Sequence, residues 1–106
     1  MTYQYKLTPL AVLDINDALD YISDKLRNPG AAKNLYRALQ KEIAAVCDNP
    51  FSFPDCSYYL IDSVAIRHSV AGNYVLIFEV SKSEKLVKIL RFLYGGMDIS
   101  HMPVSE

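Results

Sequence analysis

The last third of the chain constrains its fold most strongly, because it holds three apolar segments separated by turn residues. The segments cover residues 64–68, 73–80 and 85–94 and are rich in Val, Ile, Leu, Phe and Tyr, which favour strands. Ala71-Gly72 and residues 81–84 separate them and are typical of hairpin turns. The pattern predicts an antiparallel meander of three strands.

Two helices are predicted before this meander. Thr8-Pro9 and Asn28-Pro29 are typical helix starts, since each pairs a capping side chain with a proline at a position that needs no N–H. Asn49-Pro50 ends the second helix. Spacings of three and four mark one apolar stripe on each helix: Val12, Ile15, Leu19, Ile22 and Leu26, then Ala32, Leu35, Tyr36, Leu39, Ile43 and Val46. The tight link between them indicates an antiparallel hairpin, with Asp14, Asp17, Asp20 and Asp24 mostly facing water.

A short strand and a loop complete the expected architecture. Residues 3–7 have the aromatic, alternating pattern of a strand, and residues 51–63 contain aromatic anchors without Lys or Arg, which we interpret as a loop. The order β-α-α-β-β-β predicts an α+β fold with the helical hairpin on one face of a curved sheet. Because the chain has 106 residues, we expect a single domain over 1–106 with a short tail over 97–106.

Composition excludes several classes of protein. Half of the residues are apolar and the formal net charge is −1, so neither a disordered chain nor a strongly basic nucleic-acid binder is indicated. The apolar runs are too short to span a membrane, and the first residues do not resemble a signal peptide. We therefore expect a cytoplasmic protein without membrane contact, in which Cys47 and Cys56 stay reduced and Cys47 serves packing.

Both faces of the last two predicted strands are apolar. Alternation places Tyr74, Leu76, Phe78 and Val80 opposite Val75 and Ile77, and it places Leu86, Leu90, Phe92 and Tyr94 opposite Val87, Ile89 and Leu93. One helical hairpin can cover only one of these faces. The aromatic loop, the tail, a second copy of the chain or a partner chain must cover part of the other.

These features together resemble the RelE/ParE superfamily of toxins from bacterial type II toxin–antitoxin systems. The element order is similar over nearly the whole chain, and the motifs are similar over residues 64–98. The motifs that carry the resemblance are Thr8-Pro9, Asn28-Pro29 followed by Ala31-Ala32, Asn49-Pro50-Phe51, Ile66-Arg67-His68 leading into 73–80, and residues 89–98.

The resemblance implies a growth-inhibiting protein that an antitoxin encoded beside it neutralises. ParE-like members inhibit DNA gyrase by binding, whereas RelE-like members enter the ribosomal A site and cut mRNA. A third alternative is a toxin fold that binds its antitoxin without an active poison. For the assembly of the chain, a homodimer is also kept as an alternative. No cofactor is expected.

The RelE-like alternative is weakened by missing cations. RNA cleavage needs stabilisation of phosphate charge and proton transfer. The approximate positions of the basic residues of that branch hold Ser63, Ala65 and Val75 here, and the arginine after the last strand falls at Gly96 or Met97. We therefore favour ParE-like inhibition of gyrase and keep cleavage as the alternative.

Two residues are candidates for catalysis in the cleavage alternative. Arg67 points away from the face of Ile66 and Val70, where it either binds phosphate or pairs with a surface carboxylate. His101 lies in the tail, where the nuclease branch keeps its acid or base, although a solvated tail residue is the favoured interpretation.

The remaining candidates have strong structural interpretations. Arg91 and Tyr94 are candidates for binding a target or phosphate, but an ion pair at the sheet edge and a core-edge aromatic residue are favoured. His68 is expected to be a hydrogen-bonded core residue. The aromatic cluster at 51–59 lacks interleaved Lys or Arg, which favours a packed loop over a base-stacking site. The two histidines have no metal-ligand spacing, so no metal is expected.

Overall fold

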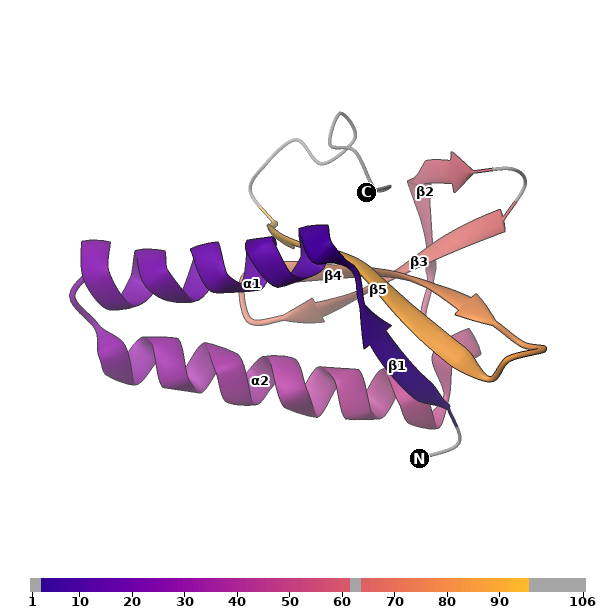
Figure 1. The fold of residues 1–106 in the computed structure, drawn as a ribbon, viewed down its shortest axis with the longest axis horizontal. Helices are drawn as coiled ribbons and strands as arrows, with labels where there is room; N and C mark the ends of the chain where they lie inside the picture. The colour runs from indigo at the N-terminus through magenta and orange to yellow at the C-terminus, as the bar shows by residue number, and fades with distance from the viewer. Residues whose placement is uncertain (1–2, 62–63, 96–106) are drawn as a thin grey trace.

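A computed structural model describes residues 3–61 and 64–95, which form one mixed sheet with a helical hairpin packed on one of its faces (Figure 1). The chain runs through β1 (Gln4–Leu7), α1 (Pro9–Asp20), a π-helical turn η1 (Tyr21–Lys25), α2 (Pro29–Asp48), a 3-10 turn η2 (Pro50–Ser52), β2 (Asp55–Ile61), β3 (Val64–Ala71), β4 (Tyr74–Ser81) and β5 (Leu86–Tyr94). None of the described helices has the length and apolar character of a membrane span.

The strands are ordered β1-β5-β4-β3-β2 in the sheet. β1 pairs in parallel with β5, and the remaining pairs are antiparallel. The predicted α+β fold, with an N-terminal strand, a helical hairpin and a meander, is confirmed. Within it, the predicted loop over 51–63 is wrong in part, because β2 occupies much of it and pairs with β3. The absence of cations suggests a loop, but the β-forming residues Tyr58, Tyr59 and Ile61 favour a strand once β3 offers an edge.

Both helices begin where the sequence predicts. The Thr8 hydroxyl accepts a hydrogen bond from the Ala11 N–H at 3.1 Å, and the Asn28 side-chain oxygen accepts one from the Ala31 N–H at 3.0 Å. Each cap satisfies a backbone donor that has no partner within its helix. α2 ends at Asp48, immediately before the predicted Asn49-Pro50 stop.

The buried face of α1 differs from the predicted stripe. α1 buries Ala11, Ile15 and Ala18, whereas Val12 is 41 % exposed. Leu26, at the end of the predicted stripe, is also exposed. The buried face of α1 therefore carries Ile15 between two small alanines. On α2 the predicted stripe is confirmed except at Tyr36, which is exposed.

Two apolar clusters lie on the two faces of the sheet, as predicted. The larger lies between the helices and the sheet and includes the buried Cys47, which confirms its packing role. Its other members include Ile15, Leu39, Ile43, Val46, Leu76, Phe78, Val87, Ile89 and Phe92. The smaller cluster on the opposite face consists of Ile66, Ile77, Leu90 and Leu93, with Val75 packed against it.

A bulge in β5 changes which of its residues face the helices. Ile77 of β4 pairs with Arg91 while the next residue, Phe78, pairs with Ile89, so Leu90 is an extra residue. Ile89 and Phe92 consequently lie in the cluster under the helices, and Leu90 lies in the other. The predicted grouping of Val87, Ile89 and Leu93 on one face is therefore wrong, since strict alternation cannot anticipate the insertion.

Candidate functional site

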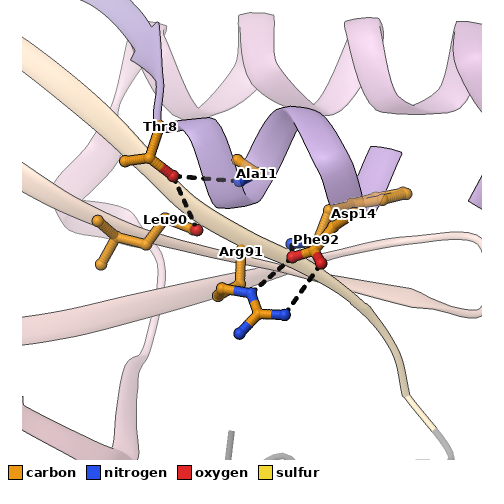
Figure 2. A network of polar contacts seen from close by, with 6 residues as sticks. All are labelled: Thr8, Ala11, Asp14, Leu90, Arg91 and Phe92. Atoms are coloured by element: carbon orange, nitrogen blue, oxygen red, sulfur yellow. Dashed lines mark hydrogen bonds and ion pairs between the residues drawn. The ribbon is translucent and has the colours of Figure 1, made fainter. Parts of the chain in front are cut away.

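β1 pairs with the edge of β5 only as far as Leu7. Beyond this point, Thr8 and a side chain of α1 form the hydrogen bonds to this edge of β5. The Thr8 N–H donates to the Ile89 carbonyl at 3.1 Å, and the Thr8 hydroxyl donates to the Leu90 carbonyl at 3.0 Å. Further along α1, the Asp14 carboxylate accepts the Phe92 N–H at 3.1 Å (Figure 2). Side chains at the start of α1 thus satisfy backbone groups of β5 beyond the end of β1.

Arg91 is held at the same place by a two-pronged ion pair with Asp14. Its Nε lies 2.6 Å from Oδ2 and its Nη2 lies 2.9 Å from Oδ1 (Figure 2). The two side chains are only 9 % and 12 % exposed. Parallel N–H···O bonds of this kind are the strong form of the arginine–carboxylate contact. The ion-pair interpretation of Arg91 is confirmed, and the expectation that Asp14 faces water is wrong.

Beside this ion pair lies a groove lined by three tyrosines, Tyr21, Tyr74 and Tyr94, which we call the tyrosine groove. Two hollows of about 330 Å³ and about 570 Å³ share these three residues. Asp14, Asp17 and Arg91 also line the first hollow, and Ile22, Leu26 and Asn73 line the second. The structure therefore brings the predicted site residues Arg91 and Tyr94 together.

Two of the three rings of the groove, those of Tyr74 and Tyr94, are in contact. Tyr74 stacks on Phe92 with centroids 4.9 Å apart and meets Tyr94 edge-on at 5.7 Å. Burial raises the pKa of the Tyr74 hydroxyl, and the neighbouring Tyr21 and Tyr94 raise it further, so the group stays a neutral hydrogen-bonding hydroxyl. Tyr94 is 49 % exposed, and its predicted contact with a target stays a prediction.

Arg67 lies apart from this groove, on β3, with β4 between it and β5. Its Nη1 donates to the Phe53 carbonyl at 2.6 Å and to the Phe51 carbonyl at 3.5 Å, which ties β3 to η2. The guanidinium carbon lies 5.1 Å from the centroid of the Phe51 ring, and the Lys82 ammonium lies 5.7 Å from it. The sequence around Phe51 lacks cations, but the fold supplies two from elsewhere in the chain. A phosphate-binding role of Arg67 stays a prediction.

The histidines add little to either region. Within the described residues, Nδ1 of His68 is buried and meets no hydrogen-bond partner, so the expected hydrogen bond is missing at this nitrogen. His101 lies outside the described residues. The described part of the chain also contains no group of three His, Cys, Asp or Glu side chains suited to hold a metal.

Asp14, Tyr21 and Tyr74 line the groove although the sequence does not predict them as site residues. A signal for Asp14 exists, because it lies between Ala11 and Ala18 at helical spacing and so shares the face of the helix that carries the alanines. Tyr21 and Tyr74 come from distant parts of the sequence and line one groove only because η1 lies beside the end of the meander. No local sequence pattern predicts that these two tyrosines line the same groove.

Comparison with known proteins assigns the family. Residues 5–99 match the family model described as the ParE toxin of type II toxin-antitoxin system, parDE. The chain belongs to this family. Among solved structures, the ParE-family chain is similar to the archaeal RelE-RelB complex from Pyrococcus horikoshii OT3, with a TM-score of 0.60 and 20% sequence identity over 91% of this chain and 98% of that chain. This likeness supports the fold. No curated protein matches the sequence.

Proposed function

We propose that this ParE-family protein is a cytoplasmic toxin that arrests growth by binding DNA gyrase and that a cognate antitoxin neutralises it. The observation that carries the proposal is the match to the ParE toxin model over residues 5–99. The antitoxin is proposed from the family description and from the similar RelE protein, which was solved as a complex with RelB.

The charges of the tyrosine groove support binding over phosphate chemistry. A nuclease must stabilise negative charge on a phosphate with cations. Arg91, the one cation among the described residues that line the two hollows, is held by both oxygens of Asp14, and Asp17 adds a negative charge. An anionic phosphate would therefore meet net repulsion in this groove.

Exposed apolar side chains near the groove suit contact with a protein. Tyr21, Leu26 and Tyr94 line the second hollow and are all among the large exposed apolar residues. Aromatic residues at a surface of this kind are enriched in the centres of protein interfaces.

A gyrase supercoiling assay with the purified protein tests the proposal. Supercoiling of relaxed plasmid is expected to stop at a molar excess of the protein and to recover when the antitoxin from the adjacent reading frame is added. Full supercoiling at every protein concentration, from a protein that still arrests growth, would contradict gyrase as the target.

RelE-like cleavage of mRNA is the second candidate, and the Phe51 region favours it. A half-exposed ring flanked by Arg67 and Lys82 offers a stacking surface and two cations to a single-stranded nucleic acid. In that candidate Arg67 stabilises the phosphate and His101 transfers the proton. New mRNA ends that require both ribosomes and Arg67 would establish it.

An inactive toxin fold is indicated if growth continues while antitoxin binding is retained.

A further inference from the structure

The tyrosine groove has a recognition chemistry that inhibition of gyrase does not itself explain. Its three rings come from three elements, with Tyr21 on η1, Tyr74 on β4 and Tyr94 on β5. η1 is a π-helical turn at the end of α1. Such turns are rare in proteins, and those that occur are often found at functional sites. The volumes of the two hollows are large enough for a side chain of a partner protein.

The net charge of the groove is negative. Asp14 and Arg91 neutralise one another through two hydrogen bonds. Asp17, three residues further along α1, lines the same hollow and is exposed. Its carboxylate therefore sets the sign of the charge that a ligand meets beside the tyrosine rings.

We propose that the tyrosine groove binds an arginine side chain of the antitoxin, which places its guanidinium against the tyrosine rings and donates hydrogen bonds to Asp17. This inference rests on the proposed function in one respect, the existence of an antitoxin. Tyrosine faces attract cations, and the guanidinium combines a flat stacking surface with a fork of N–H donors that fits a carboxylate.

Other anchors fit the groove less well. A purely apolar side chain would bury the Asp17 carboxylate without a hydrogen-bond donor, which is unfavourable. An acidic side chain would meet like charge. Lysine supplies the charge but lacks the planar surface that stacks on the exposed rings of Tyr21 and Tyr94.

Calorimetry that measures the affinity of the whole chain for the antitoxin tests this inference. Asp17→Asn and Tyr94→Ala are each expected to weaken binding about tenfold, which is the range of a desolvated cation–π or charge-assisted contact. Tyr94→Phe keeps the ring and should bind as the wild type does. The matched controls are Asp20→Asn, on the same helix but outside the lining of both hollows, and Tyr36→Ala, a similarly exposed tyrosine on α2.

Replacement of the antitoxin arginines by glutamine, one at a time, identifies the partner residue. One such replacement is expected to cause the same loss as Asp17→Asn, and the two together should cause little more than either alone. Equal affinity of the wild type, Asp17→Asn and Tyr94→Ala, or strictly additive losses for every arginine, would overturn the inference.

The probe N-acetylarginine amide, followed by NMR on the protein alone, supplies a second readout. It should shift the ring signals of Tyr21, Tyr74 and Tyr94 more than neutral N-acetylcitrulline amide does, and equal shifts would count against recognition of charge. Gyrase inhibition is measured without antitoxin, so a failure of the proposed target and a failure of this groove give different results.

Discussion

Arg91 and Arg67 flank β4 from its two neighbouring strands, yet their guanidinium groups have different surroundings. Arg91 is buried and bonded to both oxygens of Asp14. Arg67 is half-buried, donates to the carbonyls of Phe51 and Phe53, and lies over the Phe51 ring. The difference shows that a cation over which a helix packs serves the fold. Arg67, by contrast, is held by backbone carbonyls and an aromatic ring and is only half-buried.

Asp14→Ala should have the largest effect on stability. It leaves the Arg91 charge buried without the Asp14 carboxylate and removes the acceptor of the Phe92 N–H, so a loss of about 3–5 kcal/mol in the free energy of unfolding is expected. Urea denaturation followed by circular dichroism measures it. Asp17→Ala, on the same helix but exposed, is the matched control and should change stability by less than about 0.5 kcal/mol. Equal effects of the two would show that the ion pair is not structural.

Arg67→Ala should cost less, about 1.5 kcal/mol, because this substitution removes hydrogen bonds at a half-buried position. The same denaturation experiment measures it. Lys82→Ala removes the other cation at the Phe51 ring and is the control, with an expected destabilisation of about 0.5 kcal/mol. An effect as large as that of Asp14→Ala would remove the contrast between the two arginines.

Thr8→Ala should destabilise by about 1 kcal/mol, since it removes the cap of α1 and the hydroxyl that donates to Leu90. Thr8→Ser keeps both hydrogen bonds and should retain most of the stability. Asn28→Ala, at the exposed cap of α2, should cost about half as much, because it lacks the second hydrogen bond. Thermal unfolding of the three variants ranks them. A larger destabilisation at Asn28 would mean that the bond to β5 adds nothing.

Tyr74→Phe should have the smallest effect, visible only in alkali. The pKa of Tyr74 is raised in the fold, so its hydroxyl contributes stability that is full below the unfolded pKa of about 10 and is lost as pH rises through the folded pKa. Unfolding measured from about pH 9 to about pH 11 should therefore lose less stability in Tyr74→Phe than in the wild type. Identical slopes would show that the groove does not protect this hydroxyl.

Local features of the fold could be predicted from the sequence, whereas contacts between distant elements could not. The caps at Thr8 and Asn28 and the turn at Gly72, whose φ of 62° suits glycine, depend on neighbouring residues alone. The bulge at Leu90 is a property of two paired strands, and strict alternation along one strand misses it. Arg91 and Asp14 are 77 residues apart. The sequence pattern favours an ion pair for Arg91, but no residue near it in the sequence identifies Asp14 as the carboxylate partner.

Primer extension on a defined mRNA in a purified translation system most directly tests the central claim that this ParE-family toxin acts by binding. The message should remain intact at protein concentrations that stop gyrase supercoiling, with the wild type and Arg67→Ala giving the same result. New ends that appear only on ribosome-engaged message, and that disappear with Arg67→Ala in a folded protein, would contradict it.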